Sequence, residues 1–308
     1  MAGISASQVK ELREKTGVGM MDCKKALTET GGDMEAAVDW LRKKGLSKAA
    51  KKAGRTAAEG LVAVALSDGA GALVEVNSET DFVARNAEFQ AFVKEAAGLS
   101  LAAEGDLEKL LAMKIGDETA QTVLTALIAK IGENMHVRRA KAIKVSPGVV
   151  VSYVHNAAAP GMGKIGVLVA LKSEGDKEKL SAFGKQLAMH IAAAAPLAVR
   201  PEEVPADVVA HERSIRGEIV RQKSAGKPEA IIEKMLEGQM RKFYEESVLL
   251  SQVFVIDGKT QVAKAVEAAA KDAGASIEVS GFVRFQVGEG VEKKSDDFAG
   301  EVSSLAGN

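Results

Sequence analysis

The chain contains the same pattern twice: an alternating apolar stretch, a glycine-containing turn and a second alternating stretch. The first copy, LVAVALSDGAGALVEVN, covers residues 61–77, and the second, GVVVSYVHNAAAPGMGKIGVLVALK, covers residues 148–172. A period of two predicts β-strands with one buried face, and the glycines predict hairpin turns. A helical pattern follows each hairpin. The sequence therefore predicts an α+β fold with two related subdomains, each packing a small antiparallel sheet against helices.

Residues 1–45 predict three short helices, which form a module too small to be an enzyme. Ser5 or Ser7 is placed to cap the first helix, and Asp33 is placed to cap the third. Apolar residues recur on one face of each helix, as in a helix that packs against its neighbours. These positions are Val9 and Leu12 in the first helix, Met20, Cys23 and Leu27 in the second, and Met34, Ala37, Val38 and Leu41 in the third.

A basic segment, RKKGLSKAAKKAGR, follows at residues 42–55 and contains no acidic residue. It is either a solvated linker, helical or flexible, or a patch that binds an acidic surface. We expect five regions along the chain. They are residues 1–55 with the three helices and the linker, 56–147 as the first core subdomain, 148–200 and 245–290 as the second, 201–244 as an inserted arm, and 291–308 as a C-terminal helix.

The inserted arm is predicted from two charged helical patterns, residues 206–223 and 228–246, joined by the turn SAGKP. Such a hairpin buries little, so we expect it to project from the core. It is either a simple intramolecular hairpin or a contact for a second copy or another partner. Its predicted antiparallel seam consists of Val208, Ile215, Ile219, Ile231, Met235 and Met240. In the terminal helix, Ser295 is the expected cap, and Phe298, Val302 and Leu305 share one face.

Charge and composition exclude several classes of protein. The 308 residues include 41 basic and 42 acidic side chains, which disfavours a dedicated nucleic-acid binder. The single cysteine, Cys23, excludes an internal disulfide framework and favours a reducing compartment. No leader-like segment or long apolar run is present, so we expect a cytoplasmic protein with no membrane partner.

No motif for an active site, metal site or cofactor site stands out. GMGKIG at residues 161–166 matches the dinucleotide fingerprint, but it lies between two predicted strands, which indicates a hairpin turn. The four histidines are far apart in the chain and lack the spacing of metal ligands, so we interpret them as surface or packing residues. They are His136, His155, His190 and His211. The sequence thus favours a binding or regulatory protein that needs no cofactor or metal.

The stretch NSETDFVARN, at residues 77–86, places an acid and an aromatic residue directly after a predicted strand. Asn86 is a good cap for the next helix, which has its own apolar stripe starting at Phe89. Ser78 and Asp81 match a capping pattern, which predicts a short separate turn. The second hairpin has no aromatic residue at the equivalent point, so the fold does not require one. The pattern alone still favours a buried Phe82, because buried phenylalanine is the commoner case.

Five motifs, in chain order, closely resemble elongation factor Ts of bacterial type. They are TGVGMMDCKKAL, NSETDFVARNAEF, KIGENMHVRR, MHIAA and GFVRFQVGEGVEK, and the resemblance extends over essentially the whole chain. It implies a factor that promotes exchange of GDP for GTP on elongation factor Tu without covalent chemistry. It also implies an N-terminal module like a ubiquitin-associated domain, a two-part core, a coiled-coil arm and a C-terminal helix.

The resemblance further implies that Asp81 and Phe82, with Thr80 and Val83 beside them, enter the G domain of elongation factor Tu near its Mg²⁺ and phosphates. It implies that Arg13, Met20 and Met21 contact the same domain, and that the second core subdomain holds another domain of this partner. The chain itself would bind no nucleotide and no specific nucleic acid, and it would act as a homodimer or in a 2:2 complex. The turn at residues 156–163 is longer than in many relatives, so its contacts and those of His155 stay open. The alternatives are an RNA- or ribosome-associated protein without exchange activity and a chaperone-like interaction protein.

Overall fold

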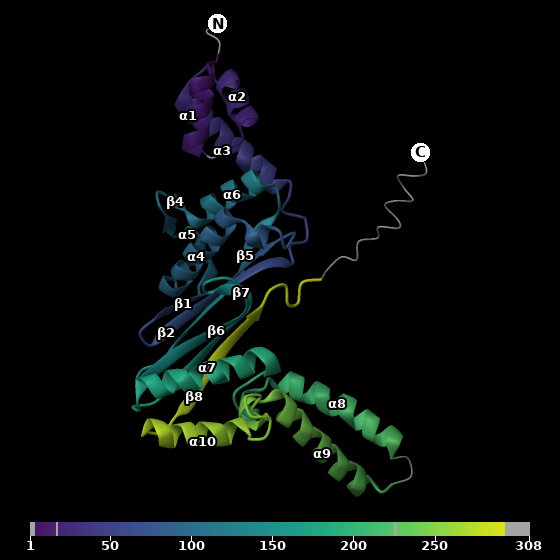
Figure 1. The fold of residues 1–308 in the computed structure, drawn as a ribbon. Helices are drawn as coiled ribbons and strands as arrows, with labels where there is room; N and C mark the ends of the chain where they lie inside the picture. The colour runs from purple at the N-terminus through teal and green to yellow at the C-terminus, as the bar shows by residue number, and fades with distance from the viewer. Residues whose placement is uncertain (1–3, 17, 225–226, 293–308) are drawn as a thin grey trace.

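The N-terminal helices form a separate layer at one end of the molecule (Figure 1). The computed structural model describes residues 4–16, 18–224 and 227–292. Helices α1 (Ala6–Thr16), α2 (Met20–Glu29) and α3 (Met34–Ala50) pack around Leu12, Cys23 and Leu27, as predicted. Ser5 caps α1 by accepting a hydrogen bond from the Gln8 amide at 3.2 Å, which decides between the two serines.

The basic segment is largely helical, because α3 continues through it to Ala50. Asp33 caps α3 as predicted, with its carboxylate 2.8 Å from the Ala36 amide. Lys44 and Lys48 both bind Asp22 of α2, at 2.6 and 2.8 Å, and these hydrogen bonds hold the pKa of Asp22 below its usual value. The segment therefore has the helical form that the linker interpretation allowed.

The strands β1 (Glu59–Ser67), β2 (Ala70–Ser78), β5 (Met135–Lys144), β6 (Gly148–Ala159), β7 (Met162–Lys172) and β8 (Glu278–Gln286) form the main sheet. Both predicted hairpins, β1–β2 and β6–β7, are present. The strands of this antiparallel sheet run in the order β5-β2-β1-β7-β6, with β8 also paired to β7. The two hairpins share one continuous sheet, joined where Val62 and Ala63 of β1 pair with Gly163 and Met162 of β7.

The sheet curls so that its two halves pack against each other. Val62 and Leu73 from one half meet Leu168, Val150 and Phe285 from the other in one buried cluster. Gly166 makes this approach possible, since a Cβ atom there would lie 2.6 Å from Val62 Cγ1 and 2.9 Å from Leu73 Cδ2. The GMGKIG segment therefore belongs to a hairpin, as predicted, and Gly166 in addition allows the two halves of the sheet to pack closely.

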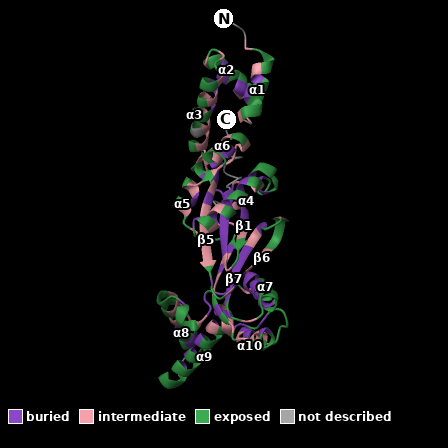
Figure 2. Cartoon of the chain, turned by 90° about the vertical axis from the view of Figure 1, so that its left-hand side faces the viewer, coloured by how far each residue is buried: buried purple, intermediate pink, exposed green. Residues whose placement is uncertain are grey.

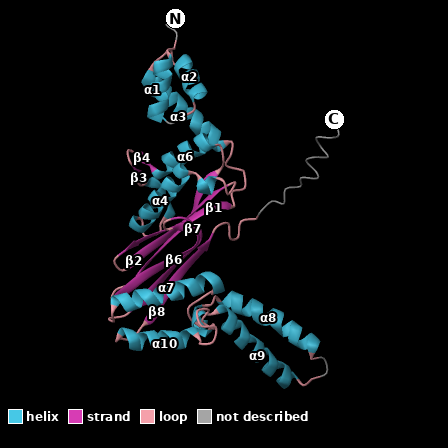
Figure 3. Ribbon diagram, viewed as in Figure 1, coloured by secondary structure: helices cyan, strands magenta, loops and turns pink. Residues whose placement is uncertain are grey.

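Helices cover the outer face of each half of the sheet (Figures 2 and 3). The first half carries α4 (Ala87–Ala102), α5 (Leu107–Ala112) and α6 (Ala120–Ile131), with the small strands β3 (Lys114–Ile115) and β4 (Glu118–Thr119) between the last two. The second carries α7 (Lys177–Ala194) and α10 (Val262–Ala273). Phe89 of α4 and Leu187 of α7 lie in separate buried clusters, so each half has its own core.

The inserted arm is a helical hairpin of α8 (Ala206–Lys223) and α9 (Glu229–Ser247), flanked by the short turns η2 (Pro201–Glu203) and η3 (Leu249–Ser251). It projects from the base of the second half (Figure 1), as expected. The predicted seam is wrong in most positions, because Ile215, Ile219, Ile231 and Met235 are exposed. Gly217, Val220, Ile232 and Leu236 lie in the interface instead, together with the predicted Met240. The predicted Val208 is partly buried and packs against the cluster that contains Leu236 and Met240. A shift of one residue turns a side chain about 100° around a helix, which accounts for the error.

The predicted terminal helix lies almost entirely in residues 293–308, outside the described residues. None of the described helices is long and apolar enough to cross a lipid bilayer.

Candidate functional site

The turn between β2 and α4 carries exposed residues, and the chain is fixed on both sides of them. The strand ends at Ser78, the turn η1 covers Val83–Arg85, and α4 begins after Asn86. Asn86 caps α4 as predicted, because its side-chain oxygen accepts hydrogen bonds from the Glu88 and Phe89 amides at 2.9 and 3.1 Å. Val83 is only 4% exposed and belongs to the core of the first half.

Phe82 points into solvent, with 76% of its surface exposed. The expectation from pattern alone, that this ring is buried, is wrong. The aromatic rings buried in the core of this half are Phe89 and Phe92 of α4, and Phe82 lies outside that cluster. Asp81 is exposed as well. An exposed aromatic ring beside an exposed carboxylate, on a backbone fixed at both ends, suits contact with another macromolecule.

The predicted Ser78–Asp81 capping pair does not form. The Ser78 hydroxyl donates to the carbonyl of Thr80 at 2.9 Å, so it tightens the turn from within. The short turn itself is present, one step later in the chain than expected, with Phe82 as its N-terminal flanking residue.

A neighbouring loop, residues 132–134 after α6, forms hydrogen bonds with this turn. The carboxylate of Glu133 accepts hydrogen bonds from the Thr80 amide at 2.9 Å and from the Thr80 hydroxyl at 2.6 Å. In return, the carboxylate of Glu79 accepts from the Asn134 amide at 2.5 Å. Sequence reasoning missed this contact, because a bond between a side chain and a backbone 53 positions away leaves no periodic signal.

The N-terminal module presents its predicted contact residues to solvent. Met20 and Met21, the first two residues of α2, are 55% and 79% exposed, and Arg13 of α1 is also exposed. Met20 therefore does not extend the apolar stripe of α2, and that prediction is wrong. Cys23, Ala26 and Leu27 fill the small core without it.

The module and the exposed turn lie at the same end of the sheet (Figure 1). Arg55, at the end of the basic segment, lies 3.5 Å from Glu79, and its carbonyl accepts from the Asn134 side chain at 2.7 Å. Lys52 donates to the carbonyl of Gly132 in the same loop. These contacts hold the last residues of the basic segment beside the turn that carries Phe82.

A second exposed apolar surface lies in the coil between α10 and the arm (Figure 1). Val253, Val255 and Ile256 are exposed there, whereas Phe254 between them is buried against His190 with ring centroids 5.6 Å apart. The Val255 amide donates to Nδ1 of His190 at 3.2 Å. One buried ring and one buried imidazole thus fix a loop whose other apolar side chains face outward.

His190 links this loop to the rest of the second half. Its Nε2 lies 2.8 Å from Oε1 of Gln252, so Nε2 carries the proton and Nδ1 is free to accept from Val255. Burial lowers the pKa of His190, although the hydrogen bond to Gln252 opposes this shift. Asp257 stiffens the far side of the loop. Hydrogen bonds from Thr260 and Lys259 lower the pKa of its carboxyl to about 2.

The long turn of the second hairpin folds back onto the sheet. The amide of Val64 in β1 donates to the carbonyl of Gly161 at 3.0 Å. His155 stays exposed on β6, with Nδ1 3.0 Å from the hydroxyl of Tyr153. The turn therefore helps to join the two halves of the sheet, and its histidine remains accessible.

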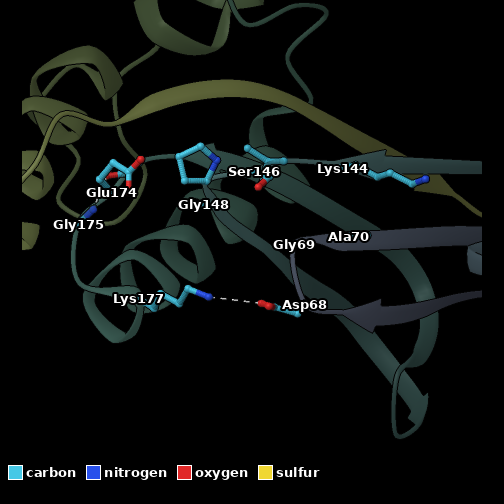
Figure 4. Close-up of a pocket in the computed structure, with 12 residues that line it drawn as sticks. Asp68, Gly69, Ala70, Lys144, Ser146, Gly148, Glu174, Gly175 and Lys177 are labelled. Atoms are coloured by element: carbon cyan, nitrogen blue, oxygen red, sulfur yellow. Dashed lines mark hydrogen bonds and ion pairs between the residues drawn. The ribbon is translucent and has the colours of Figure 1, made fainter.

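A cavity of about 680 Å³ lies at the other end of the sheet, among the turns near residues 68–70, 144–148 and 173–177 (Figure 4). Lys177 lies 3.5 Å from Asp68, and Lys144 lies 2.5 Å from Glu104. Its lysines are paired, and the described residues that line it include no aromatic side chain, whereas a typical small-molecule site is lined mainly by hydrophobic and aromatic residues. Within the described ranges, no three metal-ligating side chains come together to hold an ion.

Comparison with known proteins identifies a family. The model of the family described as elongation factor TS matches residues 79–289. The chain is 60% identical to elongation factor Ts of Rhodospirillum rubrum over 307 residues, which cover 99% of both chains. It is 59% identical to elongation factor Ts of Parvibaculum lavamentivorans over 308 residues, with 99% of each chain covered. It is also 59% identical to elongation factor Ts of Maricaulis maris over 312 residues, covering 100% of this chain and 99% of the relative.

Proposed function

The chain belongs to the elongation factor Ts family and is a guanine-nucleotide exchange factor of elongation factor Tu, and we propose that the exposed turn at residues 80–83 carries this activity. The observation that supports this role is the exposure of Phe82 on a fixed backbone. Val83, which follows it, is buried, and Thr80, two residues before it, is hydrogen-bonded to Glu133. The protein is not a catalytic enzyme, because nucleotide exchange makes and breaks no covalent bond in the factor.

Exchange requires that the factor bind the nucleotide-free partner more tightly than the GDP-bound partner. Linkage makes this antagonism reciprocal, so the factor weakens GDP binding by the same ratio by which GDP weakens binding of the factor. A coupling free energy of about 4 kcal/mol corresponds to about a thousand-fold change in affinity. The energy for this change comes from contacts that form only when the nucleotide site is open.

In our proposal, Phe82 enters the G domain of elongation factor Tu and separates side chains near its Mg²⁺, while Asp81 stabilises the displaced arrangement. Mg²⁺ is the largest local charge in such a site, so a small change in its coordination weakens the hold on the phosphates. Phe82 exposes 76% of its surface, which amounts to roughly 150 Å² that a pocket in the partner can bury. At ~25 cal/mol per Å², this area limits the contribution of the ring to ~4 kcal/mol.

The remaining surfaces supply affinity. Arg13, Met20 and Met21 contact the same G domain from the N-terminal module. The exposed loop with Val255 and Ile256 contacts another domain of elongation factor Tu. Both surfaces combine exposed apolar side chains with a fixed backbone, which limits the entropy lost on binding.

We propose residues 1–55 as a module like a ubiquitin-associated domain, 56–147 as the first core subdomain, and 148–200 with 245–290 as the second. The arm at residues 201–244 serves as a coiled-coil contact in a homodimer or a 2:2 complex, and residues 291–308 form the C-terminal module. The site of action is the cytoplasm, where elongation factor Tu works.

An RNA-binding role is disfavoured by the charges in the basic segment. Arg42 pairs with Glu118 at 2.9 Å, Lys44 and Lys48 pair with Asp22, and Arg55 lies near Glu79. Cations already paired with carboxylates contribute little to phosphate binding, because the carboxylate must first be displaced.

The test is release of fluorescent GDP from elongation factor Tu, followed by stopped flow over a range of factor concentrations. The wild-type chain is expected to accelerate release to a plateau, and Phe82→Ala is expected to lower that plateau strongly while the half-saturating concentration changes little. Leu66→Ala, which removes another exposed apolar side chain on β1, is the matched control and is expected to behave as wild type. Equal plateaus for wild type and Phe82→Ala would move the site away from this turn.

A further inference from the structure

The loop at residues 132–134 is joined to the turn before Phe82 by reciprocal hydrogen bonds. Glu133 accepts from the amide and the hydroxyl of Thr80, and Glu79 accepts from the amide of Asn134. Each carboxylate thus satisfies a backbone donor of the opposite segment. Hydrogen bonds to a charged acceptor are stronger than neutral ones and constrain the donor more tightly.

The bonds from Glu133 act directly before the exposed residues. Thr80 is partly buried, whereas Asp81 and Phe82 are exposed. Beyond Phe82 the chain is anchored again, since the Arg85 amide donates to the carbonyl of Phe82 at 3.1 Å and Val83 is buried. Without Glu133, the amide and the hydroxyl of Thr80 would both lose their acceptor. Thr80 would keep only the bond that its carbonyl accepts from the Ser78 hydroxyl, and the segment would otherwise be held through Glu79.

The same loop also contacts the end of the basic segment. Lys52 donates to the carbonyl of Gly132, and the side chain of Asn134 donates to the carbonyl of Arg55 at 2.7 Å. One three-residue loop therefore holds both the turn with Phe82 and the connection to the N-terminal module. Its position at the end of α6 ties it to the core of the first half.

We propose that Glu133 is a positioning residue for nucleotide exchange, which holds Thr80 so that Asp81 and Phe82 are presented in their active conformation before the partner binds. This inference rests on the function proposed above for the turn. A preorganised turn avoids the loss of conformational entropy on binding, so the contacts of Phe82 are available to open the nucleotide site. Glu133 needs no contact with elongation factor Tu to have this effect.

The experiment compares Glu133→Ala and Glu133→Gln with wild type in the stopped-flow release of fluorescent GDP from elongation factor Tu. For Glu133→Ala we expect the plateau rate to fall about tenfold, the effect of losing hydrogen bonds to a charged group, while the half-saturating concentration stays within about twofold. Glu133→Gln keeps one acceptor oxygen and is expected to give an intermediate plateau. Glu118→Gln, which removes an exposed carboxylate of the same half, is the matched control and is expected to match wild type.

Amide hydrogen exchange of the free protein provides a readout that does not depend on the partner. Peptides containing residues 80–82 are expected to lose protection in Glu133→Ala, while peptides from α4 keep theirs. If residues 80–82 lose protection from exchange while the plateau rate of GDP release stays unchanged, the proposal is overturned, because exchange activity would then not depend on the bonds from Glu133. Retained protection would overturn it as well. A lower melting temperature with loss of plateau and affinity together would assign Glu133 a purely structural role.

Phe82→Ala separates failure of this inference from failure of the proposed function. If Phe82→Ala loses the plateau and Glu133→Ala keeps it, only the role of Glu133 is refuted. If Phe82→Ala itself exchanges GDP as wild type does, the function proposed for the turn fails, and the role of Glu133 fails with it.

Discussion

Glu75 is the buried charge that joins the two halves of the curled sheet, and its removal gives a quantitative test of the fold. It lies on β2 with no solvent exposure. Its carboxylate accepts from Arg139 Nε at 2.5 Å, Arg138 Nη1 at 3.2 Å, the Asn77 side chain at 3.0 Å and the Gly288 amide at 2.8 Å. Because Gly288 follows β8, one carboxylate holds the end of the second half against the first.

The cost of Glu75→Gln follows from these contacts. A glutamine can still accept from Gly288, but its amide nitrogen would face a guanidinium group. Arg138 would lose its counter-charge, whereas Arg139 would keep its ion pair with Glu289 at 3.3 Å. Breaking a fully buried ion pair costs about 3–5 kcal/mol. Arg138 and Arg139 are 23% and 29% exposed, so water can solvate them in part. We therefore expect the free energy of unfolding to fall by ~2–3 kcal/mol.

Urea unfolding followed by circular dichroism measures this loss as a shift in the midpoint at an unchanged slope. Glu104→Gln is the matched control. It breaks an ion pair with Lys144 on the neighbouring strand β5, where both side chains are largely exposed, and it is expected to leave the midpoint unchanged. A Glu75→Gln protein within ~0.5 kcal/mol of wild type would refute the assignment of this network as the connection between the halves.

Three further predictions concern the second half and the curl of the sheet. Burial lowers the pKa of His190, so its contribution to stability is complete above its ordinary pKa near 6.5 and is lost as pH falls below that value. The free energy of unfolding of wild type, measured between pH 5 and 7, should therefore fall as the pH falls. This dependence should be weaker in His190→Leu, where His136, whose pKa is also lowered by burial, accounts for the rest. Gly166→Ala should destabilise the protein by about 1–3 kcal/mol in urea, since the added Cβ meets Val62 at 2.6 Å, whereas Gly98→Ala, with nothing within 4 Å on α4, should be neutral or stabilising. The double change Val255→Asp and Ile256→Asp should raise the half-saturating concentration of the factor in GDP release about tenfold or more. The plateau rate and the melting temperature should stay unchanged. A lowered plateau would contradict a role of this loop limited to affinity.

Local pattern was sufficient for most elements of the fold. The two hairpins and the caps at Asp33 and Asn86 follow from periodicity and turn chemistry, which act over a few residues. Helix α10 could have been predicted in the same way, since Val262, Val266 and Ala273 recur on one face before Gly274. The arm's seam could not, because two adjacent apolar positions on a helix are nearly equal candidates for the interface.

Contacts between distant segments were beyond such reasoning. The pairing of Val62 with Gly163 makes one sheet of two hairpins, yet neither residue signals it in the sequence. Phe82 lies outside the core that contains Phe89 and Phe92, and which rings a core takes in is decided by packing in three dimensions. The resemblance to elongation factor Ts placed this ring outside the core, whereas the local pattern favoured the interior.

The central claim is that contacts of Phe82 with elongation factor Tu favour the nucleotide-free form and thereby weaken the binding of GDP. The most direct measurement is the ratio of two dissociation constants, for the GDP-bound and the nucleotide-free forms of elongation factor Tu, with wild-type protein and with Phe82→Ala. We predict a large ratio for wild type and a ratio up to about a thousand-fold smaller for Phe82→Ala, with affinity for the GDP-bound form unchanged. The same ratio for both proteins would show that the coupling arises elsewhere and would contradict the account.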